Sequence, residues 1–211
     1  MVCVDPNDIP CCSIVDAELM YTLPKGTTAA TGLDALTHAI EGYITKGAWE
    51  MSDMFEIEAI RMINKYIRTA VFEPTNPVGR NGMAVAQYIA GMAFSNVGLG
   101  VVHGMAHPMG SLFDVPHGVA NALLLPTIME FNAPACIDKY VEIAKAMNAY
   151  KEGMTKEEAA ELDASVRRAM NAFSYEDDIS ASKLSGGNDA NDTTLKRYRY
   201  RCFYNITYME E

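Results

Sequence analysis

The sequence is poor in positive charge. It also lacks the patterns typical of membrane proteins, secreted proteins and proteins with a phosphate-binding loop. Its formal net charge is −10, which argues against a nucleic-acid partner because such a partner requires a basic surface. No apolar run reaches the ~20 residues that a membrane-spanning helix needs, so no membrane partner is expected. Polar residues interrupt the first segment, so no signal peptide is expected either. Neither a GxGxxG nor a GxxxxGKS/T phosphate loop is present. An acidic globular protein of the cytoplasm is the expectation.

The cysteines do not form a recognisable site. Their number is odd, and no two of them have the CxxC spacing of a zinc or redox site. Free thiols in a reducing cytoplasm are therefore expected.

Apolar residues make up 49% of the chain and charged residues 21%, which is typical of a protein with a real core. Their periodicity predicts a mainly α fold. Residues 1–26 contain short β-type runs at 2–4 and 13–15 and are expected to be a strand and linker that lead into a helical domain over 27–173. Beyond that domain the pattern fades, and 174–211 is expected to be a divergent tail. The expected helices are 27–43 with a cap at Thr27 or Thr28, 52–71, one from near Arg80 to Phe94, one from 116 or 117 to at least 126, 137–147, and 156–173 with a capping box of Thr155 and Glu158.

Only four histidines are present, at positions 38, 103, 107 and 117, and all lie in or beside apolar sequence rich in glycine and alanine. The stretch 95–110 has no charged residue other than histidine and is expected to be buried. Burying an imidazole without a partner is costly. A metal ion or a hydrogen-bond network is therefore expected to supply the partner.

Asp34 precedes His38 by four positions, which places both side chains on one face of a helix. An acid and an imidazole in this arrangement can bind one metal ion together. The alternative is an aspartate in the first turn of a helix followed by an ordinary histidine on its surface.

A second group strengthens the metal hypothesis. His103 and His107 are again four apart, and His117 follows in Pro-His-Gly. One acid with three or four imidazoles suits Fe²⁺, Zn²⁺, Co²⁺ or Mn²⁺, whereas Ca²⁺ and Mg²⁺ prefer oxygen ligands. The neighbouring glycines either let helices pack closely or let a ligand approach the backbone.

Two stretches resemble the hallmarks of the iron-containing (group III) alcohol dehydrogenases. They are ATGLDALTHAIEGY at 30–43 and the segment 100–118, with its HxxxHP and PHG, and the resemblance runs from about 2 to 173. It implies the helical metal-binding domain of that fold and one divalent ion, usually iron with zinc as the alternative. The residues that match the family's metal ligands are Asp34, His38, His103 and His117. The implied reaction is hydride transfer between a short alcohol, diol or aldehyde and NAD.

The resemblance also implies two substrate-side residues. His107 matches a residue that lies by the substrate and relays a proton or orients the substrate. Phe94 matches a residue that lines the pocket, with a plain core position as the alternative. Full-length family members are commonly dimers, so a homodimer is an expected assembly, with the assembly of this chain left open.

The sequence departs from the family at both ends. Family members carry an N-terminal Rossmann-like half that binds the dinucleotide. This half is expected to be missing here. The turn at Leu23 and Pro24 is then a weak candidate for a nicotinamide contact. Near the other end Asp189 follows Gly-Gly-Asn where the family has proline. The alternatives are therefore an inactive metal-binding fragment or pseudogene product, or a relative with other chemistry, such as a glycerol dehydrogenase-like or dehydroquinate synthase-like zinc protein.

Overall fold

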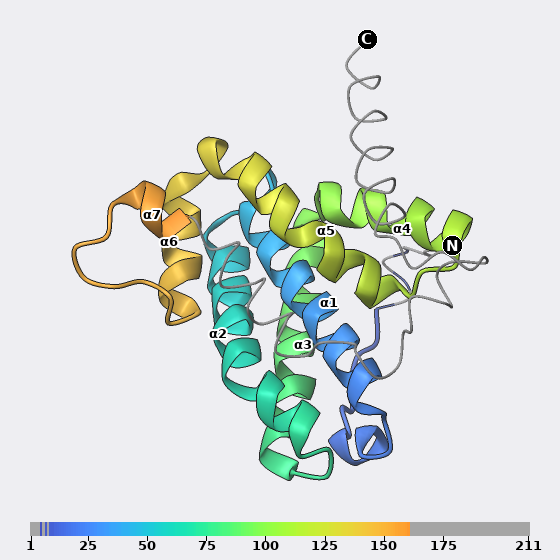
Figure 1. The fold of residues 1–211 in the computed structure, drawn as a ribbon. Coiled ribbons are helices and arrows are strands. Elements are labelled where there is room, and N and C mark those ends of the chain that lie inside the picture. The colour runs from blue at the N-terminus through green and yellow to red at the C-terminus, as the bar shows by residue number, and fades with distance from the viewer. Residues whose placement is uncertain (1–4, 6, 8, 161–211) are drawn as a thin grey trace, which may run out of the picture.

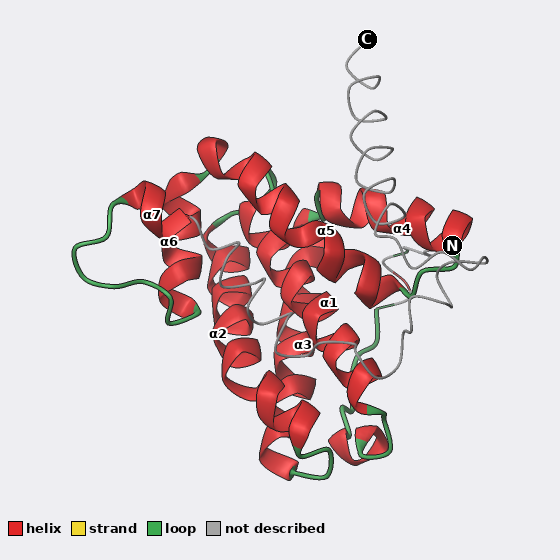
Figure 2. Cartoon of the chain, viewed as in Figure 1, coloured by secondary structure: helices red, strands yellow, loops and turns green. Residues whose placement is uncertain are grey.

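The computed structural model describes residues 5, 7 and 9–160. Within these residues every regular element is a helix, as Figure 2 shows, so the expected mainly α fold is confirmed. In chain order the helices are η2 (Ala17–Met20), α1 (Lys25–Ile44), α2 (Glu50–Phe72), α3 (Pro77–Val97), α4 (Val101–Phe113), α5 (His117–Asn132), η3 (Ala133–Ala135), α6 (Ile137–Ala146) and α7 (Lys156–Ala160).

Helix α1 is the centre of the bundle. It is buried on almost every side, and it contacts α2, α3 and α5 (Figure 1). A helix that is apolar nearly all round belongs in the interior. Small residues such as Ala39 and Ala59 let α1 and α2 approach closely, and Ile40, Ile60 and Ile63 fill the core between the helices. The buried faces of α1 are therefore held by packing against its neighbours.

Helices α4 and α5 carry three of the four histidines. The chain bends by 103° between α3 and α4, and α4 then packs on α5 through a small cluster of its own, Ala106, Met109, Val115 and Ala120. Since α5 also packs on α1, the starts of α4 and α5 are brought beside the central helix. In the described part of the chain no single helix is long and apolar enough to cross a membrane, although the bent pair α3–α4 reaches that length and hydropathy when taken together.

Two predicted helix starts are wrong by a few residues. Helix α1 begins at Lys25 with Pro24 as its N-cap, so neither Thr27 nor Thr28 caps it. Helix α3 begins at Pro77 rather than near Arg80, because the Asn76 side chain accepts hydrogen bonds from the backbone of 78 and 79, and proline is favourable in a first turn.

The other expected helices lie close to their predicted positions. Helices α2 and α6 lie within two residues of the predicted bounds, and α5 begins at His117 as expected. The capping box of α7 is confirmed, since Glu158 N donates to Thr155 Oγ1 at 3.2 Å and Thr155 N donates to Glu158 Oε2 at 2.8 Å. The rest of the helix predicted to run to 173, and the tail 174–211, lie outside the described residues.

Two further expectations are corrected. Residues 13–15 are not a strand: they have no neighbouring strand in the described chain, and Ile14 is 90% exposed. The run at 2–4 lies outside the described residues. The stretch 95–110 is buried only in part. One face of α4 is turned inward and buries Val102, His103 and Ala106, whereas His107 and its neighbours on the opposite face are exposed.

Candidate metal centre

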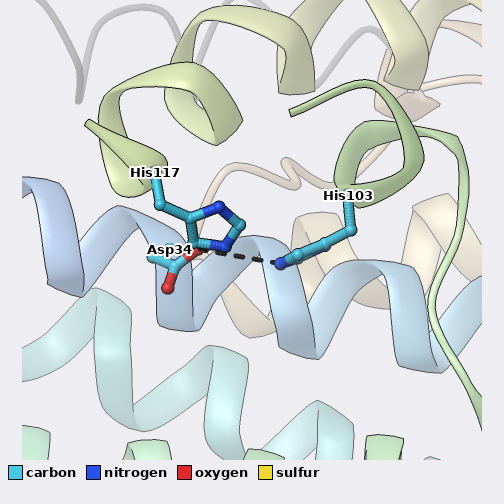
Figure 3. Close-up of side chains that lie close together, drawn as sticks. All are labelled: Asp34, His103 and His117. Carbon is cyan, nitrogen blue, oxygen red and sulfur yellow. Dashed lines mark ion pairs between the residues drawn. The ribbon is translucent and has the colours of Figure 1, made fainter. Parts of the chain in front are cut away.

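Three helices bring one carboxylate and two imidazoles around a common point. Figure 3 shows Asp34 from α1 beside His117 from the start of α5, with the ring of His103 from α4 directed toward both. Asp34 Oδ1 lies 3.7 Å from His103 Nε2 and 3.5 Å from His117 Nε2, and the three atoms all lie within 4.8 Å of one another. Donor atoms bound tetrahedrally to one ion at the usual bond lengths are about 3.4 Å apart. The spacing and chemistry of this donor set therefore fit a single divalent ion such as Fe²⁺ or Zn²⁺.

His38 lies beside this group without being one of the three. Its Nδ1 is 3.9 Å from Asp34 Oδ2, one helical turn away on α1, and its ring centroid is 4.2 Å from that of His103. Phe94 from α3 stacks on the His38 ring, with centroids 4.5 Å apart and planes at 15°. The structure thus places Phe94 against a histidine of the cluster.

His107 completes the group of four histidines. It is exposed on α4 and stacks on His117 with ring centroids 5.1 Å apart. The weak candidate for a nicotinamide contact lies elsewhere, because Leu23 and Pro24 stand at the start of α1 and Asp34 follows Pro24 by ten residues, about 15 Å along the helix. The Leu23 carbonyl accepts a hydrogen bond from the buried Arg80 at 3.4 Å.

Asn121 is a residue of the centre that the motifs did not single out. It is fully buried on α5, one turn after His117, and its Nδ2 lies 3.1 Å from both His103 Nε2 and His117 Nε2. The same nitrogen donates to Asp34 Oδ1, whereas its Oδ1 has no hydrogen-bond partner among the described residues. A single amide within reach of all three candidate ligand atoms shows how closely those atoms converge. Its signal in the sequence is one polar residue inside the apolar run 119–125.

Glu41 is the second such residue. Its side chain is almost completely buried on α1, and its two oxygens accept hydrogen bonds from the backbone of Val102 at 2.7 Å and of His103 at 3.2 Å. His103 Nδ1 lies 2.8 Å from Glu41 Oε2. The sequence does contain a signal that could have identified it: Glu41 is a charged residue with uncharged neighbours on both sides, seven positions after Asp34.

Burial and the neighbouring carboxylates set the protonation of the cluster. Burial lowers the pKa of His38 to about 4 and also lowers the pKa of His117, in both cases against the charge of Asp34. Burial acts in the same direction on His103, but hydrogen bonds to Asp34 and Glu41 outweigh it and raise the pKa of His103 to about 9. Burial favours protonation of Asp34, yet its histidine and Asn121 partners together lower its pKa. An ionised carboxylate beside neutral imidazoles is the form that binds a cation, and binding at His103 would release a proton.

A glycine fixes the distance between α5 and α1. A Cβ on Gly118 would lie only 2.4 Å from the backbone oxygen of Ala30, so the start of α5 can approach α1 this closely only without a side chain at that position. Because His117 is the neighbouring residue, this approach holds its imidazole near Asp34. At Gly118 the absence of a side chain therefore serves the close packing of two helices.

Known proteins are similar to this chain in both sequence and fold. Residues 28–180 match the model of the C-terminal part of the iron-containing alcohol dehydrogenase family. Lactaldehyde reductase of Escherichia coli K12 is 53% identical over 158 residues, which are 75% of this chain and 41% of that protein. For 1,3-propanediol dehydrogenase of Citrobacter freundii the identity is 47% over 161 residues, 76% of this chain and 42% of that protein.

A solved structure of a 1,3-propanediol oxidoreductase superposes with a TM-score of 0.76 at 35% identity, covering 89% of this chain and 54% of that one. The chain thus spans about two fifths of the length of the curated relatives it matches. By a family match that covers well over half of its residues, the chain belongs to the iron-containing alcohol dehydrogenases and carries their helical C-terminal domain.

Proposed function

We propose that the chain supplies the metal-binding half of the active site of an NAD-linked, iron-dependent alcohol dehydrogenase. The proposed ligands of the ion are Asp34, His38, His103 and His117. The observation that carries the proposal is the convergence of Asp34 Oδ1 on two imidazole Nε2 atoms at 3.5 and 3.7 Å, from three separate helices. The relatives named lactaldehyde reductase and 1,3-propanediol dehydrogenase support a short diol or its aldehyde as the substrate.

The family name supports iron as the native metal, and zinc is the alternative, because a carboxylate with imidazoles accepts either ion. When bound, such an ion supplies Lewis-acid polarisation of the substrate oxygen. The relatives extend well beyond the residues that match this chain, and we propose that NAD is held by that additional part. A homodimer in the cytoplasm is our expectation for the complete enzyme.

Two side chains of this domain have proposed roles toward the substrate. His107 is exposed and stacks on His117, so its ring can exchange a proton with a hydroxyl that approaches the centre. Phe94 is half-buried and covers one face of His38, where its ring can pack on the carbon atoms of the substrate.

The ligand assignment is tested by metal analysis. The purified chain, stripped of metal and incubated anaerobically with Fe²⁺ or with Zn²⁺, is expected to retain about one ion per chain after gel filtration, because a catalytic site of this donor set holds a single ion. The variants Asp34→Ala and His103→Ala are expected to lose it. The matched control is His107→Ala, which removes an imidazole that is not a proposed ligand and should keep the ion. Full metal retention by both ligand variants would falsify the assignment.

The catalytic part of the proposal needs a measurement of turnover. The chain alone is expected to show little NAD-dependent oxidation of 1,2-propanediol. A chimaera in which this chain replaces the matching segment of E. coli lactaldehyde reductase is expected to be active. In that chimaera His107→Ala should lower kcat by roughly 10²-fold or more while the ion is kept. An ion-loaded, folded chimaera without turnover would favour the alternative, a metal-binding fragment without catalysis.

A further inference from the structure

One face of α1 carries three residues that can meet a metal centre or its ligands. Asp34, His38 and Glu41 are spaced i, i+4 and i+7, which places them in one row along the helix. The first two are half-buried at the centre itself, whereas Glu41 is 1% exposed. A carboxylate this deeply buried is stable only if its oxygens accept hydrogen bonds. Its partners therefore indicate what it does.

All the partners of Glu41 lie in the first turn of α4. The backbone N–H groups of Val102 and His103 donate to Oε1 and Oε2 at 2.7 and 3.2 Å. These groups have no acceptor within their own helix, and the N-cap residue, Gly100, gives no side-chain hydrogen bond. A Cβ on Gly100 would lie 2.6 Å from Glu41 Oε1, so glycine leaves the room that the carboxylate occupies. Glu41 thus caps α4 from a neighbouring helix.

The third partner is the ring of His103. Carboxylate oxygens only accept hydrogen bonds, so at 2.8 Å from Oε2 the His103 Nδ1 is the donor. With the Nδ1 proton directed at Glu41, the Nε2 atom on the other side of the ring points to Asp34 and His117. Histidine ligands of metal ions are commonly oriented in this way by a carboxylate outside the ligand set.

We propose that Glu41 is a positioning residue of the metal centre: it fixes the tautomer and the direction of His103 so that Nε2 faces the ion. The inference rests on the proposed metal site and adds to it a residue outside the ligand set. The competing interpretation is that Glu41 only caps α4. A cap needs the backbone donors alone, yet Oε2 lies closer to the ring nitrogen than to the backbone nitrogen of the same residue, at 2.8 against 3.2 Å.

The variant Glu41→Gln keeps part of the cap and removes the acceptor for the ring. Its amide oxygen can replace Oε1 and keep the hydrogen bond from Val102, which places the NH₂ group opposite His103 Nδ1 and the backbone N–H of His103. That NH₂ group can only donate, so the ring is driven to the tautomer with its proton on Nε2, the atom that must face the ion. We expect Zn²⁺ affinity, measured by competition with a chromophoric chelator, to fall by roughly 10- to 100-fold. The visible spectrum of the Co²⁺-loaded protein is expected to change as well.

The matched control is Glu56→Gln. Glu56 is also a fully buried glutamate, on the neighbouring helix α2, but neither of its oxygens has a hydrogen-bond partner among the described residues. The control should leave Zn²⁺ affinity and the Co²⁺ spectrum unchanged. Circular dichroism of both variants checks that the helical fold is kept.

A measurement on the unaltered chain covers the case in which Glu41→Gln fails to fold. Long-range ¹H–¹⁵N spectra of the Zn²⁺-loaded protein, in which only four histidines need assignment, are expected to show His103 protonated at Nδ1 and ligated through Nε2. The opposite pattern, or a folded Glu41→Gln variant that binds Zn²⁺ as tightly as the unaltered chain, overturns the role of Glu41 alone. Absence of Zn²⁺ binding by the unaltered chain overturns the metal site itself, so the two failures are distinguishable.

Discussion

Asn121 occupies a buried position where a second negative charge would lie directly against Asp34. Its amide nitrogen donates to Asp34 Oδ1 from a fully buried site. In Asn121→Asp two carboxylates face each other, and like charges at this distance disfavour the ionised pair. We predict that the metal-free variant loses about 1–3 kcal/mol of stability and that Zn²⁺ restores more stability to it than to the unaltered chain, as measured by thermal melting. Asn121→Ala, which adds no charge, should show no such extra gain. A metal-free Asn121→Asp variant as stable as the unaltered chain would contradict the proposed contact.

Glu56 makes the stability of the domain depend on pH. Burial first, and then the charge of Asp53, raises the pKa of Glu56 from 4.5 to about 9. The folded state therefore keeps a proton that the unfolded chain releases above pH 4.5, so Glu56 lowers stability progressively as pH rises from about 4.5 to about 9.

Glu56→Gln removes this titration and keeps the shape of the side chain. We predict that it is more stable than the unaltered chain by at least about 1 kcal/mol at pH 8, with the difference vanishing near pH 5. Urea unfolding at several pH values measures the effect. A difference that is constant across this range would show that Glu56 does not titrate as described.

At the scale of single residues, spacing predicted that two proposed ligands share a helix face but not what surrounds them. The interval of four between Asp34 and His38 places both on one helix face, and the structure has them there. That His103 and His117 come to Asp34 from other helices was expected from their apolar setting and from the family resemblance, not from spacing, because periodicity within one helix carries no information about a second helix. Glu41 was missed for the same reason, since its partners lie 61 and 62 positions away in the chain. Asn121 lies 87 positions from Asp34 but only four from His117, so its place on the face of His117 was open to prediction from spacing.

At the scale of the helices, the approach of α5 to α1 decides whether the proposed ligands Asp34 and His117 meet. In Gly118→Ala the new methyl group would overlap the Ala30 carbonyl, and since that atom is backbone, α5 must move away from α1. We predict a loss of about 1–3 kcal/mol of stability and weaker Zn²⁺ binding, because His117 moves with α5. Chemical unfolding and chelator competition measure the two effects.

The control for this helix substitution is Gly91→Ala. Gly91 lies inside α3, and a Cβ there has open space around it. Alanine in a helix interior is favoured over glycine, so this variant should gain up to about 1 kcal/mol and bind Zn²⁺ normally. If both alanine variants behave alike, the close approach at Gly118 is not what positions α5.

The positions of the helices were predictable where the sequence contains an apolar stripe at helical spacing or a capping motif. The apolar stripe of α2 and the capping box of α7 gave their positions, and Pro-His-Gly gave the start of α5. Helix α4 was not predicted as an element, because glycine at 104 and proline at 108 weaken any helical pattern. It forms because tertiary contacts outweigh that propensity: α5 packs along one face, and Glu41 caps its first turn.

At the scale of the whole molecule, the proposed ion would connect α1 to α4, two helices that have few apolar contacts with each other. Helix α1 contacts α2, α3 and α5, whereas α4 packs mainly on α5 through its own small cluster. Asp34 and Glu41 on α1 are therefore the polar connections between the central helix and the start of α4. The periodicity of the apolar residues indicated a helical core, but the order in which the helices pack depends on contacts distant in sequence, which a single sequence does not reveal.

Because the proposed ligands come from α1, α4 and α5, a bound ion must stabilise the fold as a unit. A ligand that binds only the folded state at 100 times its Kd adds about 2.7 kcal/mol, which for a chain of this size corresponds to a rise in Tm of roughly 5–10 °C. We predict such a rise with Zn²⁺ in the unaltered chain and none in Asp34→Ala. Mg²⁺ is the control ion, since it prefers oxygen ligands and should leave Tm unchanged. An equal rise with both ions would mean that the effect comes from the acidic surface of the chain rather than from a site built of imidazoles.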